Sequence, residues 1–173
     1  QVGHCKLGRN TRRLRKEMKI TIINRSDHHG GAAVASRRLC AALREAGHDA
    51  RLLVTDSDGT LAWSTIAAPQ WRARLPWITE RLGVLAHNGC RRDTLWAIDP
   101  ATHGLPLHRH RLVTDADVLV LGWTNQGMLS LDGLAALCAL GKPTYWVMHD
   151  MWPMTGLCHH SHDCAAYEAT CRT

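Results

Sequence analysis

The chain has 173 residues, of which 45% are hydrophobic, and this length and composition suit one globular domain with an apolar core. Its formal net charge of +6 would suggest nucleic acid as a partner, but residues 1–17 carry six basic groups against one acidic group. The rest of the chain is therefore close to neutral, which argues against nucleic acid, and apolar runs such as 118–121 are far shorter than the ~20 residues of a membrane-spanning helix.

Residues 1–17 form a basic extension before the first regular element. We expect it to be a disordered tail or sequence upstream of the true start, because a basic arm of this kind is usually solvated. Met18-Lys19-Ile20 is typical of a natural beginning, so the predicted domain covers residues 18–173. No apolar stretch of secretory-signal type follows the basic start, and we therefore expect a reducing, cytoplasmic setting for the seven cysteines.

The first predicted elements form a βαβ unit. Residues 19–23 are apolar and β-branched, as in a strand buried on both faces. Residues 32–46 place apolar side chains at helical spacing and end before Gly47, a typical residue after a helix C-terminus. Residues 50–54 predict a second strand, which a right-handed crossover places parallel to the first.

The middle of the chain, 56–111, is less regular. Residues 69–85 predict either one helix or two helices broken at Pro76, and residues 87–111 predict a loop or a short helix. Regular alternation then returns, with a strand at 117–121, a loop at 122–127, a helix at 129–140 and a strand at 144–148. Alternating strands and helices with glycine turns predict an α/β fold with a Rossmann-like, doubly wound and mainly parallel sheet.

The first candidate site is Asp27-His28-His29-Gly30-Gly31, between the first strand and the first helix. Paired glycines allow close approach of a ligand, and the helix N-terminus behind them offers free amide donors suited to phosphate. The sequence after Gly30 lacks the G-x-G-x-x-G spacing of dinucleotide-binding enzymes, so a dehydrogenase is not indicated. A tight turn without a ligand stays open as an alternative.

The second candidate site is His149-Asp150, just beyond the last predicted strand. Open α/β sheets place their chemistry at the carboxyl ends of their strands. A histidine there can bond a substrate hydroxyl or titrate near neutrality, and the adjacent carboxylate can orient it. A purely structural role for His149 is the alternative.

A third cluster of potential ligands lies near the C-terminal end and comprises Cys158, His160, Cys164 and Cys171. Thiolates and imidazoles at such separations can bind zinc, but structural zinc sites commonly use paired C-x2-C motifs, and none is complete here. Zinc, a local disulfide and free thiols all stay open, and free thiols are favoured.

Several blocks of the sequence share one resemblance. They are Met18–Ile22, Gly30–Ala35 with Arg38-Leu39, Ala116–Val118 through Gly122–Gly127, Leu129–Leu131, and Gly141–Pro143 through His149–Gly156. These blocks resemble the N-terminal domain of GT-B glycosyltransferases, specifically the family-4-like bacterial enzymes of surface-polysaccharide assembly. The match covers most of residues 18–171, and its last block is long and specific.

The resemblance implies an acceptor-side domain that faces a second, nucleotide-sugar-binding domain across a cleft. It also implies a set of site residues: Gly30 and Gly31 on the donor phosphate side, His149 and Asp150 beside the transferred sugar, and Trp123 and Asn125 on the neighbouring strand-end loop. Transfer in such enzymes typically retains anomeric configuration and usually needs no metal or other cofactor.

The chain departs from the pattern of this group in three places. Val120-Leu121-Gly122-Trp123 stands where many relatives carry a histidine-rich strand, so acid/base work is not expected there. The cysteine cluster of the group normally has a further cysteine just beyond Cys171. The donor domain is missing, and we therefore expect a truncated chain.

The leading hypothesis is the N-terminal half of a glycosyltransferase that is inactive without its donor domain. It would use a nucleotide-sugar donor and a glycan or lipid-linked acceptor. The expected location is the cytoplasm, and peripheral attachment to the inner membrane stays open as an alternative. The alternatives are a non-catalytic module that binds glycan or acceptor, and a small interaction protein stabilised by zinc.

Overall fold

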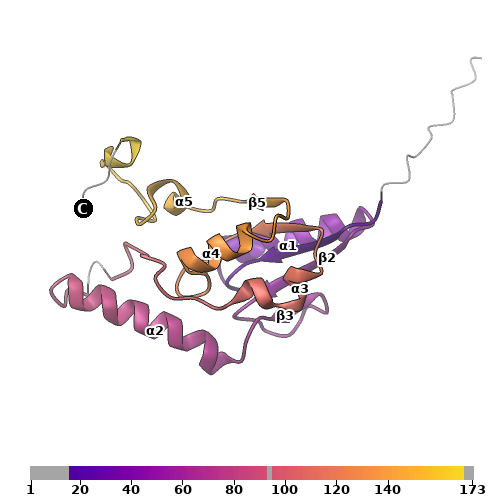
Figure 1. Ribbon diagram of the computed structural model, residues 1–173, viewed down its shortest axis with the longest axis horizontal. Helices are drawn as coiled ribbons and strands as arrows, with labels where there is room; N and C mark the ends of the chain where they lie inside the picture. The colour runs from indigo at the N-terminus through magenta and orange to yellow at the C-terminus, as the bar shows by residue number, and fades with distance from the viewer. Residues whose placement is uncertain (1–15, 93–94, 170–173) are drawn as a thin grey trace, which may run out of the picture.

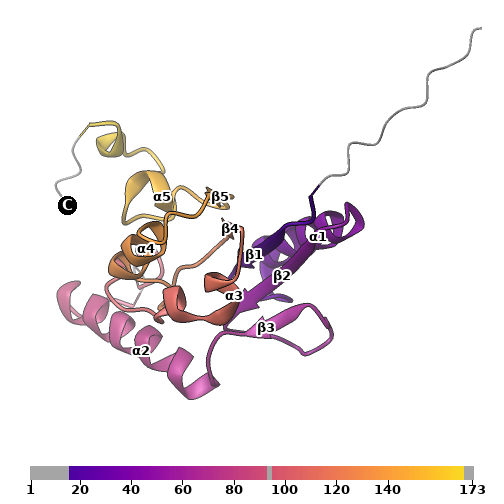
Figure 2. The same cartoon turned by 45° about the vertical axis from the view of Figure 1, so that its right-hand side comes forward.

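The computed structural model describes residues 16–92 and 95–169, and it confirms the predicted α/β fold. Five parallel strands form one sheet in the order β3-β2-β1-β4-β5 (Figures 1 and 2). The strands are β1 (Lys19–Ile23), β2 (Asp49–Val54), β3 (Ser64–Ile66), β4 (Val118–Leu121) and β5 (Thr144–Trp146). The helices are α1 (Gly30–Glu45), α2 (Gln70–His87), α3 (Arg111–Thr114), α4 (Leu131–Cys138) and α5 (Trp152–Thr155), with 3-10 turns η1 (Leu107–Arg109) and η2 (Ala166–Glu168).

The central strand β1 is buried because its apolar side chains alternate between the two faces of the sheet. Ile20 and Ile22 pack with Leu52, Val54 and Val120 against α1. Ile23 lies on the opposite face. Figure 2 shows α1 on one side of the sheet and α3 and α4 on the other. A strand buried in this way needs apolar residues at successive positions, which explains the continuous run from which it was predicted.

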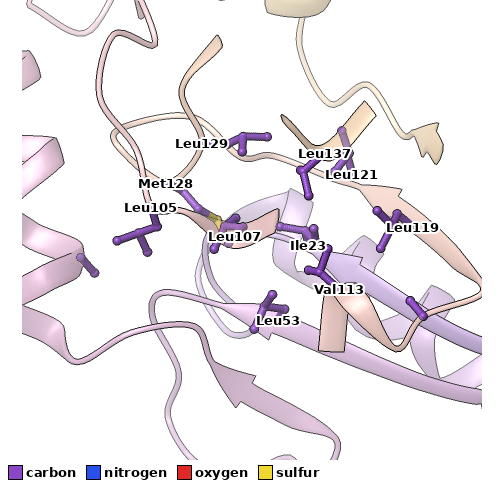
Figure 3. Close-up of a cluster of buried hydrophobic side chains, with 12 residues drawn as sticks. Ile23, Leu53, Leu105, Leu107, Val113, Leu119, Leu121, Met128, Leu129 and Leu137 are labelled. Atoms are coloured by element: carbon purple, nitrogen blue, oxygen red, sulfur yellow. The ribbon is translucent and has the colours of Figure 1, made fainter. Parts of the chain in front are cut away.

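The second face of the sheet carries the larger apolar cluster (Figure 3). It joins Ile23, Leu53 and Leu119 to Val113 of α3 and Leu137 of α4. Each of these five side chains is fully buried. No described helix is both long and apolar enough to cross a membrane.

The structure differs from the sequence prediction at some elements and decides between its alternatives at another. Strand β3 was missed, because three residues are too few for a periodicity to be read. Strand β5 ends at Trp146 rather than Met148, and Val147 and Met148 are exposed beyond it. Helix α2 is a single helix that continues through Pro76, which is one of the two predicted alternatives, although an interior proline typically costs ~3 kcal/mol. Packing of its inner face therefore outweighs the loss of one backbone bond.

A buried charged cluster holds α2 against the following loop. Glu80 is 1% exposed and Asp99 is fully buried. Glu80 accepts a hydrogen bond from the backbone of Thr102 at 3.0 Å, and Arg81 donates to the carbonyl groups of Leu95 at 2.6 Å and Ile98 at 3.0 Å. Burial, together with the charge of Asp99 and a hydrogen bond with it, raises the pKa of Glu80 to about 7 against the opposing effect of Arg81.

This raised pKa predicts a pH-dependent stability. The folded chain binds a proton at Glu80 that the unfolded chain releases above about pH 4.5, so this contribution is present at low pH and is lost as the pH rises through 7. We expect Glu80→Gln to reduce the fall in unfolding free energy between pH 5 and pH 8 by roughly 1–3 kcal/mol, measured by urea unfolding. Glu45→Gln, on the exposed side of α1, is the matched control. An unchanged pH slope in Glu80→Gln would refute the assignment.

Candidate functional site

The carboxyl ends of β1, β4 and β5 meet at one edge of the sheet, because the three strands are adjacent and parallel. The segments that follow them line an open pocket of about 420 Å³. It is lined by His29, Gly30, Gly31 and Ala32 from the start of α1, by Trp123 after β4, and by His149 and Asp150 after β5. The structure thus brings together five of the six predicted binding and catalytic residues from three separate parts of the sequence.

One wall of the pocket is the N-terminus of α1. The helix begins at Gly30, two residues before the predicted start, and Gly30 has φ +82, which L side chains rarely adopt. The hydroxyl oxygen of Ser26 accepts hydrogen bonds from the backbone amides of His28 at 3.2 Å and His29 at 3.1 Å. The amides of the first helical turn have no intrahelical acceptor, so this wall carries a partial positive charge.

Trp123 is held in place from both ends. Its backbone amide donates to Asn24 Oδ1 at 2.8 Å, and its indole Nε1 donates to Asp150 Oδ2 at 2.8 Å. Asn24 is 1% exposed, and its oxygen would lie 2.6 Å from a Cβ added at Gly122. A glycine at 122 is therefore needed for this contact. Sequence analysis missed Asn24, because nothing local marks a single amide at a strand end.

Asp150 joins three segments of the site. Besides Trp123, its carboxylate contacts His159 Nδ1 at 2.7 Å and accepts a hydrogen bond from the backbone amide of Trp152 at 3.0 Å. The Asp150 side chain is only 11% exposed. A carboxylate with these three partners is suited to fixing the positions of Trp123 and His159, and less suited to accepting a substrate proton.

His149 is the pocket residue with unused hydrogen-bonding capacity. Its Nε2 is buried, and no hydrogen-bond partner for it exists among the described residues. Buried polar atoms are normally paired, and an orphan at the wall of a pocket is commonly completed by a ligand or by water. His149 can therefore donate to, or accept from, a group that enters the pocket.

The remaining predicted residues do not join this pocket. Asn125 is 4% exposed and is absent from the pocket lining, although it follows Trp123 closely in the sequence. Cys158, His160 and Cys164 do not gather into a three-ligand group within the described part of the chain. Cys171 and most of the 1–17 extension lie outside the described residues.

Asp27 is a buried carboxylate that sequence analysis named only as part of a loop. Its Oδ2 accepts hydrogen bonds from Ser57 and Ser64, both at 2.6 Å, and its Oδ1 lies 3.1 Å from His28 Nδ1. Burial would raise the pKa of Asp27, but the hydrogen bonds from these side chains and from the backbone of Asp58 outweigh it and lower the pKa. Asp27 is therefore ionised near neutral pH. The two serines come from the segment around β3, which explains why no local pattern revealed them.

Comparison of the chain with protein-family models, with curated proteins and with solved structures finds no match. The resemblance to GT-B glycosyltransferases therefore stays a prediction, and a function has to be inferred from the geometry of the site.

Proposed function

We propose that this chain is the acceptor-side half of a retaining glycosyltransferase that acts with a separate donor-binding domain. The observation that carries the proposal is the pocket itself, whose lining joins Gly30 and Gly31 at the start of α1 to His149, a histidine whose Nε2 has no partner among the described residues. A nucleotide-sugar has matching chemistry, because it joins an anionic diphosphate to a hydroxyl-bearing ring.

In the proposed reaction the bond between the anomeric carbon and the diphosphate oxygen breaks, and the acceptor oxygen bonds to that carbon on the same face. The acceptor proton leaves with the diphosphate. The first turn of α1 stabilises the departing negative charge, as helix N-termini do for phosphate. His149 bonds a hydroxyl of the transferred sugar, and Trp123, fixed by Asp150, supplies an apolar wall.

The proposal is tested by an assay of protein that contains this chain together with a donor domain. A panel of nucleotide-sugars is supplied with and without a polyprenyl-linked glycan acceptor, and released nucleoside diphosphate is measured. Acceptor-dependent release with at least one donor is expected. If no donor is consumed while the chain still binds the acceptor by calorimetry, the non-catalytic binding module is the better assignment.

Helix α2 presents a surface suited to a membrane-borne acceptor. Trp71, Leu75, Ile78 and Leu82 are 67%, 58%, 42% and 59% exposed, and their spacing places them along one side of the helix. Figures 1 and 2 both show α2 at the margin of the molecule, with no other element on its outer side.

The charges around this α2 surface are of one sign. Arg72 and Arg74 are exposed, whereas the one acidic residue between positions 70 and 92, Glu80, is buried. Apolar side chains flanked by arginines match an anionic lipid surface, which attracts basic residues and admits apolar ones. We therefore propose that α2 contacts the cytoplasmic face of the membrane and that the acceptor is lipid-linked.

Vesicle sedimentation tests the contribution of α2. We expect the full chain to bind phosphatidylglycerol vesicles. The double variant Leu75→Ser, Leu82→Ser should bind them at least about tenfold more weakly, because burial of each leucine side chain in the membrane contributes ~1.5–3 kcal/mol when insertion is complete. Leu131→Ser, at a similarly exposed leucine on α4, is the control. Residues 1–17 stay in every variant, so their charges contribute equally. Equal binding by all variants would exclude α2 as the contact surface.

A further inference from the structure

A cluster of three potential metal ligands lies beside the pocket. His28, His29 and Asp56 each offer one ligand atom, and these atoms all lie within 4.8 Å of one another. Among residues 16–92 and 95–169, no other group of three or more His, Cys, Asp or Glu side chains has its ligand atoms this close together. It differs from the cysteine-rich cluster that the sequence suggested, because it joins the ends of two strands that lie far apart in the sequence.

The backbone that carries the three side chains is fixed. The strands β1 and β2 continue past their ends through a parallel bridge between Ser26 and Asp56. The amide of Asp56 donates to the carbonyl of Arg25 at 3.0 Å, and the amide of Asp27 donates to the carbonyl of Asp56 at 3.2 Å. The position of Asp56 relative to the two histidines is therefore set by the sheet rather than by a free loop.

The buried Asp27 orients His28 so that its Nε2 faces Asp56. The Oδ1 of Asp27 lies 3.1 Å from His28 Nδ1, and a carboxylate oxygen at this distance accepts a hydrogen bond from a protonated Nδ1. The lone pair is then on Nε2, which lies 3.8 Å from Asp56 Oδ2. A carboxylate behind a histidine in this way is the usual second partner of a metal-bound imidazole.

We propose that His28, His29 and Asp56 bind a divalent transition-metal cation that prefers imidazole, with zinc as the representative. Two imidazoles and one carboxylate suit zinc and its neighbours and do not suit magnesium or calcium, which prefer oxygen ligands alone. Ligand atoms of a tetrahedral site with bonds of about 2.0–2.1 Å lie roughly 3.3 Å apart. Small rotations of the half-exposed Asp56 side chain and of the exposed His29 side chain would bring the three ligand atoms to this spacing.

The neighbouring charges allow a cation at this place. Asp27 and Asp56 together bring two negative charges. The guanidinium of Arg25, the nearby cation that interacts with Asp56, donates to the carbonyl of Gln126 at 2.8 Å. No ion pair within 4.0 Å joins Arg25 to Asp56 in the described residues.

Because His29 also lines the pocket, the cation would border the pocket with at least one coordination position open. Metal binding does not depend on the proposed sugar transfer.

The experiment is equilibrium dialysis of the full chain against zinc chloride, followed by metal analysis. It is done in a background with Cys158, Cys164 and Cys171 replaced by serine, so that the other cluster cannot contribute. One zinc per chain is expected. Asp56→Asn, at a half-exposed carboxylate whose loss leaves the core intact, should weaken binding at least tenfold, and His28→Ala should do the same.

Asp27→Asn distinguishes a constructed site from two surface histidines. It leaves all three ligands in place, and loss of such an outer carboxylate typically weakens metal binding about 10–100-fold. His87→Ala, at an exposed histidine of α2, is the control and should bind zinc normally. Circular dichroism verifies that each variant is folded. The proposal is overturned if the background chain binds no zinc, or if folded Asp56→Asn and His28→Ala bind it as tightly as the background chain.

Discussion

Replacing His149 by alanine is expected to lower the turnover of sugar transfer by about two to three orders of magnitude, the usual effect of removing a positioned hydrogen-bonding group that stabilises the transition state. The His149 Nε2 has no partner among the described residues, so the substitution breaks no bond of the fold on that side of the ring. The unfolding midpoint should therefore stay within a few degrees of the parent value. The measurement is steady-state nucleoside diphosphate release by protein that includes a donor domain.

The matched control for this prediction is His160→Ala. His160 is exposed, lies eleven residues further along the chain and does not line the pocket. Its loss should leave turnover unchanged. If His149→Ala retained the parent turnover while both variants remained folded, His149 would be a structural residue, and the proposed contact with the sugar hydroxyl would have to be abandoned.

The parts of the site that sequence analysis found are those with a local signal. The strand β1 is followed by the glycine pair Gly30-Gly31, and β5 is followed by His149. Each of these two sides of the pocket could therefore be predicted from one short segment of sequence. That the two sides meet follows from parallel strands, whose carboxyl ends share one edge.

The parts that sequence analysis missed depend on partners distant in the chain. Asp27 is ionised because Ser57 and Ser64 reach it from the segment around β3, some thirty residues away. Asp56 lies near His28 only because β1 and β2 pair in register. A charged residue gives no indication of such partners from its own neighbourhood, and one sequence without relatives supplies no other signal.

Gly127→Ala is expected to have the largest effect on stability of any single methyl addition in the loop after β4. Gly127 has φ +76, and an added Cβ would lie 2.7 Å from the Cα of Trp77 and also overlap its backbone nitrogen. The obstacle is helix backbone, which cannot rotate away as a side chain can. Left-handed strain and overpacking together should lower the free energy of unfolding by about 3–5 kcal/mol.

Gly141→Ala separates the two causes. Gly141 has a similar φ of +66, but nothing lies within 4 Å of an added Cβ, so only the left-handed strain of about 1–2 kcal/mol should remain. Urea unfolding of both variants gives the difference directly. A larger loss in Gly127→Ala would mean that α2 and the loop carrying Trp123 are held together by backbone contact, so that displacing the helix also disturbs the pocket. Equal losses would mean instead that α2 yields easily, and the close contact at Gly127 would then contribute nothing to the position of Trp123.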